Sequence, residues 1–304
     1  MEAMRGALAP RGHRVARWIG DDAAVVAAGG GAAVVSTDAM VEGVHFRLDW
    51  ITAADVGHRA LAGALSDLAA MGADAGEAYL ALGVGGSLSG AGALELVRGA
   101  EALAARCGVT IAGGDVVGSP VAFVTFTVVG WALNVGSLVG RDGARPGDLV
   151  GVTGHLGGAA AAIERLSQRG AAVAHDDELI MRYARPMPRL AEGRALADLG
   201  AHAMIDLSDG LASDAELIAQ ASGVALEIDL EALPLAAGVS DPALAASGGE
   251  DYELCFCVAP SQRDEVAAAV GEVSWIGTVL DGAGAHFGDA SGERELHGFE
   301  HRLT

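Results

Sequence analysis

Acidic side chains recur along this chain beside glycine, serine and threonine, a combination that suits bound phosphates and hard metal ions. In the first such group, Asp21 and Asp22 precede two short apolar runs, 23–27 and 32–36, with three glycines between the runs. We predict a β-hairpin here, because glycine permits the positive φ values of a tight connection. The hairpin would bring both aspartates close to the oxygen-bearing residues at the end of the second run, which are Ser36, Thr37 and Asp38.

Carboxylates that lie this close raise each other's pKa and repel one another unless cations hold them. Hard oxygen ligands of this kind suit Mg²⁺ or Ca²⁺. A hairpin with solvated acidic ends explains the stretch equally well when it is taken by itself.

Asp67 lies inside a predicted helix, 53–72, whose apolar residues recur at helical spacing. Its neighbours three and four positions away are small or apolar, so its carboxylate should point toward packed surface, where an unpaired charge is costly. Asp67 therefore needs a partner. The partner is either an ion pair with Arg59 or His58, or a metal ion shared with the hairpin aspartates.

Three further turns place carboxylates beside glycine at the ends of predicted strands. Gly113-Gly114-Asp115 follows strand 109–112, Asp206–Gly210 joins strand 203–207 to helix 211–221, and Ser247–Asp251 precedes strand 252–258. Glycine lets the backbone approach a phosphate, and aspartates at a strand end can reach one cation cluster. Plain turns, and helix capping by Ser208 or Asp209, are the alternatives.

The chain carries a net charge of −21, and all 19 of its basic residues are arginines. The negative charge argues against unaided binding to nucleic acid or to anionic lipid. Because the sequence contains no lysine, it has no Walker-A lysine, no strand lysine of the protein-kinase type and no Schiff-base lysine. A site that handles phosphates would therefore use metal ions, arginine and backbone amides.

A chain of 304 residues predicts two α/β domains. The turn-rich stretch 140–148 marks the boundary, so we expect an N-terminal domain over 1–140 and a C-terminal domain over 141–304. The part before Gly20 is poorly periodic and is predicted to be loosely ordered. The longest nearly uncharged apolar run, 120–133, falls short of the roughly 20 residues that cross a bilayer, so no membrane span is expected.

The sequence has three cysteines, an odd number that fits a reduced, cytoplasmic protein. Two of them, Cys255 and Cys257, alternate in a strand-like run and should share one face. We interpret them as small core residues in preference to a redox or metal pair.

Seven motifs together resemble one enzyme family, the thiamine-monophosphate kinases of the aminoimidazole ribonucleotide synthetase superfamily. In chain order they are IGDDAAVV, STDAMVEGVHF, LSDLAAMGA, AGGD, GRDGARPGD, IDLSDGL and SGGEDYEL. Their order and spacing hold over nearly the whole chain from Gly20 to His301. The resemblance implies an α/β fold with mixed sheets in two domains, a homodimer built through the N-terminal sheets, and ATP-dependent phosphorylation of thiamine monophosphate to the diphosphate.

The resemblance also implies roles for single residues, with no side chain acting as a covalent nucleophile. The expected ligands of several Mg²⁺ ions are Asp22, Ser36, Thr37, Asp38, Asp67, Asp115, Asp206 and Asp209. The expected ATP contacts are Gly114, Asp115, Arg141 and Ser208. The expected thiamine phosphate contacts are His45, Glu250 and Phe299. A carboxylate and an aromatic face suit a cationic thiazolium, and Arg141 would take the place of the missing lysine as phosphate clamp.

Two other functions stay open at this point. One is a sister synthetase of the same superfamily that acts on another substrate, and the other is a non-catalytic acidic protein that binds divalent cations.

Overall fold

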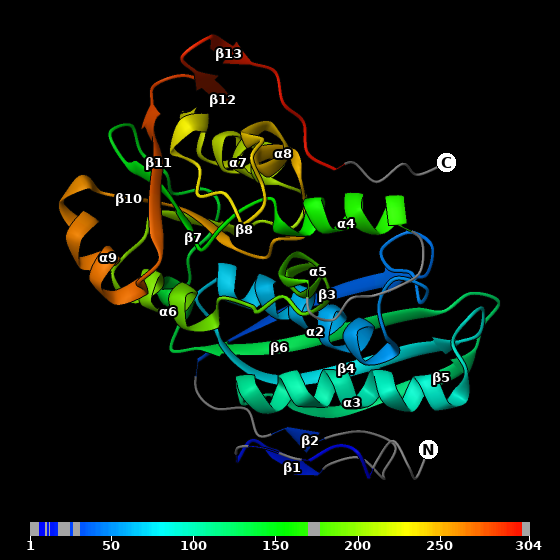
Figure 1. Ribbon diagram of the computed structural model, residues 1–304. Helices are drawn as coiled ribbons and strands as arrows, with labels where there is room; N and C mark the ends of the chain where they lie inside the picture. Colours follow the sequence, from blue (N-terminus) through cyan, green and yellow to red (C-terminus); the bar gives the residue numbers. More distant parts are fainter. Residues whose placement is uncertain are drawn as a thin grey trace.

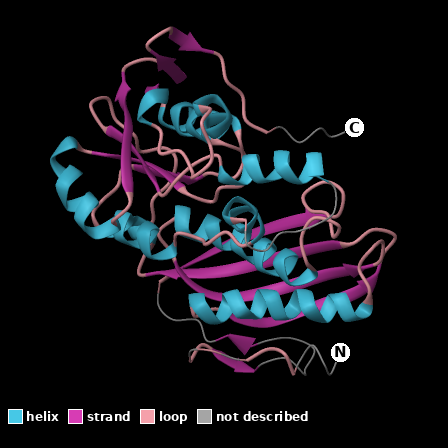
Figure 2. Ribbon diagram, in the orientation of Figure 1, coloured by secondary structure: helices cyan, strands magenta, loops and turns pink. Residues whose placement is uncertain are grey.

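The computed structural model describes residues 6–9, 11, 13–17, 25–26, 31–169 and 177–299. Its main body stacks a four-stranded sheet from the first half of the chain against a seven-stranded sheet from the second half, with helices between them (Figure 1, Figure 2). The mixed α/β architecture with mixed sheets confirms the predicted fold class.

The first half supplies β1 (Val15–Arg17), β2 (Val25–Val26), β3 (Ala32–Val41), α2 (Ala53–Ala70), β4 (Asp74–Val84), α3 (Gly90–Cys107), β5 (Thr110–Gly118), β6 (Phe123–Ala132) and the 3-10 turn η1 (Val135–Ser137). The four-stranded sheet has the order β3-β6-β4-β5, in which β4 and β5 run parallel and the other pairs are antiparallel. Helices α2 and α3 cover one face of this sheet, and the side chains of β6 alternate between buried and partly exposed.

The hairpin predicted from the runs 23–27 and 32–36 is wrong. Strand β2 pairs with β1 in a separate two-stranded sheet, whereas β3 pairs along its whole length with β6. The physical reason is that β6 offers a partner to every residue of β3, while β2 is only 2 residues long. Asp21 and Asp22 lie outside the described residues.

The second half supplies β7 (Leu149–Thr153), α4 (Gly158–Arg169), α5 (Glu178–Ala184), α6 (Leu190–Asp198), β8 (Ala203–Asp206), α7 (Leu211–Ser222), β9 (Ala225–Asp229), η2 (Leu230–Ala232), α8 (Pro242–Ser247), β10 (Leu254–Val258), η3 (Pro260–Gln262), α9 (Arg263–Val270), β11 (Val273–Leu280), β12 (Gly284–Asp289) and β13 (Gly292–Arg294). The seven-stranded sheet has the order β13-β12-β9-β11-β7-β10-β8. Only β12 and β9 run parallel within it.

Two sequence predictions about strand extent need correction. The strand predicted to end at Ala112 continues as β5 to Gly118, because Gly114 and Asp115 pair in register with Leu80 and Ala81 of β4. The Gly-Gly-Asp motif is therefore part of a sheet and not a turn. The N-terminal part predicted to be loosely ordered contains β1, which pairs with β2.

The two alternating cysteines are core residues, as predicted. Cys255 and Cys257 lie on β10, are fully buried and pack in the core of the second half. Burial raises the pKa of the Cys255 thiol to about 12, so this thiol is unreactive near neutral pH. Among the described helices, none is both long and apolar enough to cross a bilayer.

Helix α2 is the centre of the packing, since it contacts α3, β3, β4 and β6 of the first half and α5, α6 and β8 of the second. Glycine makes the closest of these approaches possible. A Cβ at Gly57 of α2 would overlap the carbonyl oxygen of Leu96 on α3, and a Cβ at Gly99 of α3 would overlap that of Ala54 on α2. The two helices therefore meet backbone to backbone at reciprocal glycines.

We expect Gly99→Ala to destabilise the protein. In a solvent-exposed helix the change would gain up to about 1 kcal/mol of helix propensity, but overpacking a tight helix contact costs about 1–3 kcal/mol. The overlap with the Ala54 carbonyl should make the net change in the free energy of unfolding destabilising, and urea unfolding measures that change. Gly90→Ala at the start of the same helix is the control, because a Cβ there meets nothing within 4 Å. Equal stability of the two variants would contradict this description of the α2–α3 contact.

Candidate active site

A cavity of about 1110 Å³ opens between the two main sheets. Its walls come from the end of β3, the loop that follows it, α2, α4, the loop after β8, the loop before β10 and the C-terminal segment. Nine residues singled out from the sequence line it: Thr37, Asp38, His45, Asp67, Asp206, Ser208, Asp209, Glu250 and Phe299. Carboxylates from both halves of the chain thus face one space.

Asp38 and Asp67 come from adjacent elements of the first half. Asp38 lies on β3, and a Cβ at Gly63 of α2 would stand 2.6 Å from its Oδ2 atom. Asp67 lies one turn further along α2 and accepts a short hydrogen bond from the Ser36 hydroxyl. The ion pair considered for Asp67 with Arg59 or His58 is wrong, because Arg59 pairs with Glu250 and His58 hydrogen-bonds the Pro186 carbonyl.

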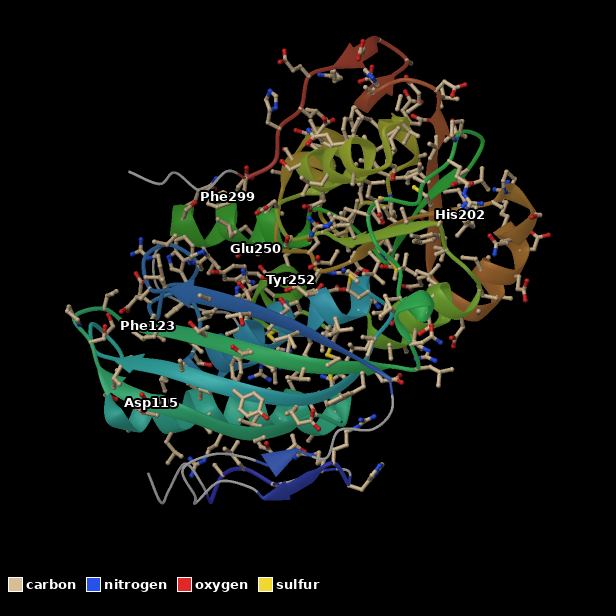
Figure 3. All side chains as sticks on the ribbon, turned by 180° about the vertical axis from the view of Figure 1, so that it is seen from behind. Asp115, Phe123, His202, Glu250, Tyr252 and Phe299 are labelled. Atoms are coloured by element: carbon tan, nitrogen blue, oxygen red, sulfur yellow. The ribbon has the colours of Figure 1, made fainter. Side chains whose placement is uncertain are left out.

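Thr37 lines the cavity, but its hydroxyl hydrogen-bonds Thr127 at 2.9 Å. The predicted site residues outside the nine named above do not line it where the structure describes them. Gly114 and Asp115 lie on β5, and Asp115 is far from Glu250 and Phe299 in Figure 3. Arg141 is exposed and lies close enough for its charge to act on Asp67 and Asp206. Asp22 is outside the described residues.

The cavity carboxylates are poorly compensated. Burial raises the pKa of Asp206 to about 7, and the charge of Asp67 adds to the shift. Burial also raises the pKa of Asp67, although the Ser36 hydrogen bond and the Arg141 charge oppose this. The pKa of Asp38 is raised by burial and by the charges of Asp67 and Glu250. Raised pKa values on three neighbouring acids mean that the protein's own cations do not fully balance the cost of burying these carboxylates.

The loop that carries Asp206, Ser208 and Asp209 is held by Asp214, a residue that the sequence interpretation missed. Asp214 is buried in the first turn of α7, and its Oδ2 atom accepts hydrogen bonds from the amides of Asp209 at 3.2 Å and Gly210 at 3.0 Å. Gly210 has no side chain to cap α7, so Asp214 binds the amides at this end. An acidic residue in the first turn of a predicted helix was the available signal.

Glu250 and Tyr252 flank the cavity in an unusual backbone conformation. Among the described residues they alone are non-glycines with positive φ, at 70° and 52°. The Glu250 and Tyr252 amides donate to the carbonyls of Ser208 and Leu207, at 2.8 and 2.9 Å. Left-handed backbone at non-glycine residues persists where the surroundings impose it and is common at binding sites. Figure 3 shows the two residues side by side between the sheets.

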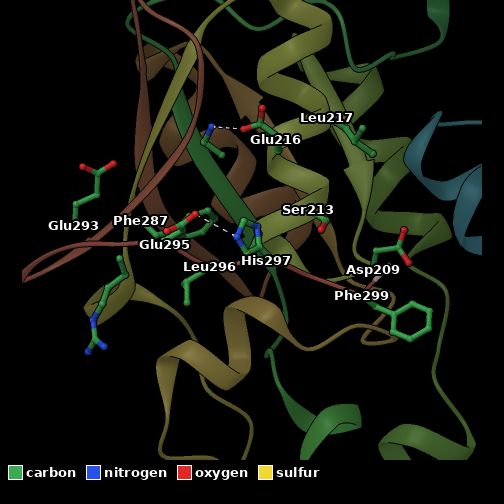
Figure 4. A pocket seen from close by; sticks show the side chains of 13 residues that line it. Asp209, Ser213, Glu216, Leu217, Phe287, Glu293, Glu295, Leu296, His297 and Phe299 are labelled. Atoms are coloured by element: carbon green, nitrogen blue, oxygen red, sulfur yellow. Dashed lines mark hydrogen bonds and ion pairs between the residues drawn. The ribbon is translucent and has the colours of Figure 1, made fainter. Parts of the chain in front are cut away.

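The C-terminal segment brings Phe299 to the cavity mouth. The Phe299 amide donates to the Asp209 carbonyl at 2.8 Å, and the Gly298 amide donates to the Ser213 hydroxyl at 3.0 Å. Phe299 is 52% exposed. Figure 4 shows the segment beside α7, where it borders a second pocket of about 790 Å³ and places Phe299 next to Asp209. Phe299 thus lines both the larger cavity and the second pocket.

The donor set of the cavity fits Mg²⁺. Its ligating groups are hard carboxylate oxygens whose raised pKa values a divalent cation would reverse. Within the described residues, no three Asp, Glu, His or Cys side chains lie close enough to enclose an ion unaided.

Comparisons with known proteins agree on one family. The N-terminal domain model of the AIR synthase related proteins matches residues 20–132, and the C-terminal domain model matches residues 145–288. A thiamine-monophosphate kinase of Mycobacterium tuberculosis is 41% identical over 279 residues, which cover 86% of this chain and 79% of that protein.

Two solved structures extend the comparison. The crystal structure of thiamine-monophosphate kinase from Stenotrophomonas maltophilia is 35% identical, with a TM-score of 0.84 and 94% of each chain covered. A structure described as "AaThiL complexed with AMPPCP and TMP" is 30% identical, with a TM-score of 0.79, and the match covers 89% of this chain and 87% of that one.

We expect Asp214→Asn to stabilise the ligand-free protein relative to wild type, increasingly as the pH rises from about 4 to about 8. Burial and the charges of Asp206 and Asp209 raise the pKa of Asp214 to about 8, whereas the unfolded chain should have a pKa of about 3.9. The wild type therefore loses stability as the pH rises through this window, by at most about 1.4 kcal/mol per pH unit. Asparagine keeps an acceptor for the two amides and does not titrate.

Urea unfolding in the presence of a chelator, at pH values from about 5 to about 9, measures this difference. Asp281→Asn is the matched control, because Asp281 is an exposed carboxylate. A stability difference for Asp214→Asn that stays constant with pH would contradict the buried, proton-binding state of this carboxyl group.

Proposed function

Because this chain belongs to the thiamine-monophosphate kinases of the AIR synthase related family, we propose that it transfers a phosphoryl group from ATP to thiamine monophosphate and forms thiamine diphosphate. The single observation that carries the proposal is the cavity, which gathers Asp67 and Asp206 with His45, Glu250 and Phe299. It therefore joins a wall suited to metal-bound phosphates with a wall suited to an aromatic cation.

The proposed substrate contacts form two sets, one for ATP and one for thiamine monophosphate. Arg141 and Ser208 would contact ATP, and Glu250, His45 and Phe299 would contact thiamine monophosphate. A carboxylate and an aromatic face both favour the cationic thiazolium ring. Mg²⁺ ions, held by Asp38, Asp67, Asp206 and Asp209 together with phosphate oxygens, would supply the positive charge that neutralises the phosphates.

The acceptor needs little activation by the protein. A phosphate monoester has a second pKa of about 6, so its attacking oxygen is already an anion near neutral pH. The task of the cavity is therefore to align the two substrates and to exclude water, and no covalent nucleophile is required. We expect direct in-line transfer.

We further propose a homodimer built through the face of the four-stranded sheet opposite α2 and α3. Val35 and Val117 are 61% and 44% exposed on β3 and β5, the two outer strands of this sheet, and a second copy would cover both. Asp115 shares this face with Val117, so a second copy would cover it. Sedimentation measures the mass, and a monomer at assay concentration contradicts this part of the proposal.

The proposed function is tested by incubating the protein with MgATP and thiamine monophosphate and separating the products by chromatography. Thiamine diphosphate should form, and omission of Mg²⁺ or the Asp67→Asn substitution should suppress it. Cation binding without ATP turnover would favour a non-catalytic acidic protein, and ATP turnover only with a different acceptor would favour a sister synthetase.

We expect Arg141→Ala to weaken the use of ATP more than that of thiamine monophosphate. Loss of a charged hydrogen-bonding partner costs about 1.5–3 kcal/mol, roughly one to two orders of magnitude in the apparent KM for ATP. Steady-state kinetics with each substrate varied in turn provides the measurement. Arg145→Ala is the control, since Arg145 lies in the same loop. If Arg145→Ala has the larger effect, the phosphate clamp belongs to Arg145.

Transfer with inversion at phosphorus is the expected stereochemical outcome. One in-line displacement inverts a chirally labelled γ-phosphorus, whereas two displacements through an enzyme intermediate retain its configuration. Analysis of thiamine diphosphate formed from chiral ATP distinguishes the two results. Retention would overturn the direct mechanism, and substitution of His45 by Ala should then be examined for loss of a covalent intermediate.

A further inference from the structure

Arg59 is a buried arginine behind the wall of the cavity. It lies on α2 with 0% of its side chain exposed, and it does not line the cavity itself. A buried guanidinium must be paired, because the free energy of burying an isolated charge is prohibitive. The identity of its partners therefore indicates what the arginine is for.

Its contacts reach two other elements. Nη2 forms a short ion pair with Oε2 of Glu250, in the loop before β10, and Nη1 donates a short hydrogen bond to the carbonyl of Tyr183 on α5. The guanidinium carbon also lies 3.9 Å from the centroid of the Tyr183 ring. The contact with the Tyr183 ring and the hydrogen bond to the Tyr183 carbonyl together fix the orientation of the guanidinium plane.

The same pair of residues supports a second part of the cavity wall. The Tyr183 hydroxyl donates to the carbonyl of His45 at 3.2 Å. Arg59 and Tyr183 thus connect α2 and α5 to both Glu250 and His45, which line the cavity from different loops.

We propose that Arg59 is a positioning residue that sets the affinity for the organic cation of the acceptor by holding Glu250 in place. The inference rests on the function proposed above, in which Glu250 faces the thiazolium or aminopyrimidine part of thiamine monophosphate. Arg59 acts only through Glu250 and touches neither substrate.

Three observations carry the inference. Glu250 adopts a left-handed backbone conformation with φ of 70°, so its position is imposed by contacts and not by local preference. Its side chain is 23% exposed and lines the cavity, which leaves part of the carboxylate for a ligand while Oε2 is bound to Arg59. The Arg59 side chain is fully buried, so its charge is balanced by protein partners and not by solvent.

The test is a double-mutant cycle on the binding of thiamine monophosphate, measured by calorimetry, with Arg59→Met, Glu250→Gln and the double variant. Arg59→Met should raise the Kd for thiamine monophosphate about tenfold, as expected for directly coupled residues. The Kd for a non-hydrolysable ATP analogue and the kcat at saturation should change by less than about twofold. In the Glu250→Gln background, Arg59→Met should have no further effect on thiamine monophosphate binding.

Arg59→Lys tests the charge with a smaller change, and it should recover most of the affinity. Arg189→Met is the matched control, because Arg189 also pairs with a buried glutamate, Glu253, at 2.6 Å, and neither residue lines the cavity. Its loss should lower stability without changing the Kd for thiamine monophosphate. If Arg59→Met does not fold, two other measurements of the Kd for thiamine monophosphate test whether Arg59 acts through Glu250. They are the Kd of Arg59→Lys, and the comparison of Glu250→Gln with the double variant.

The inference is overturned by wild-type affinity in folded Arg59→Met, or by additive effects in the double variant. It is also overturned if Arg189→Met weakens thiamine monophosphate binding as much as Arg59→Met does, since the effect would then be one of general stability. Wild-type protein that binds thiamine monophosphate but does not phosphorylate it would refute the proposed function alone. Wild-type turnover with an unaltered Kd in Arg59→Met would refute this inference alone.

Discussion

The burial of α2 on all sides is the constraint on which the site depends. Sixteen of its 18 residues are buried, and three of its charged residues, Asp55, Arg59 and Asp67, each need a partner from another element. Asp55 pairs with Arg185 at 2.6 Å, Arg59 with Glu250, and Asp67 accepts from Ser36. Each partner belongs to a different segment of the chain. The pairing of the charged residues of α2 therefore also holds in place the segments that form the cavity wall.

Small residues make this arrangement possible. Gly57 lets α3 approach the backbone of α2, Gly63 leaves room for Asp38 and Tyr252, and Gly193 of α6 approaches the Ala69 carbonyl. Each glycine costs the helix up to about 1 kcal/mol relative to alanine. The close approaches offset this loss of helix propensity, because they place elements of both halves within hydrogen-bonding reach of one helix.

The sequence predicted the helices and the acidic turns after β8 and before β10 well, because both depend on local patterns, but the Gly-Gly-Asp motif that it placed in a turn lies within β5. The periodic stretch 53–72 is α2, and the aspartates after the strand at 203–206 do face the cavity. It did not predict strand pairing, since β3 pairs with the distant β6 and no local pattern records that choice. Asp214 and Arg59 were missed for a related reason: their roles come from partners brought together only by the fold.

The balance of charge in the cavity limits how it can bind a nucleotide. Four aspartates, Glu164 and Glu250 line the space, and the one arginine among the described lining residues, Arg47, is paired with Asp49 at 2.7 Å. Burial raises the pKa values of Asp206 and Asp214, and the charges of neighbouring carboxylates add to both shifts, so these acids hold protons more tightly than exposed ones do. An anionic nucleotide adds to the excess, so its binding is favourable only together with cations that displace those protons. Under the function proposed above, metal ions that accompany the nucleotide would supply most of the positive charge in this lysine-free chain, and Arg141 would add to it.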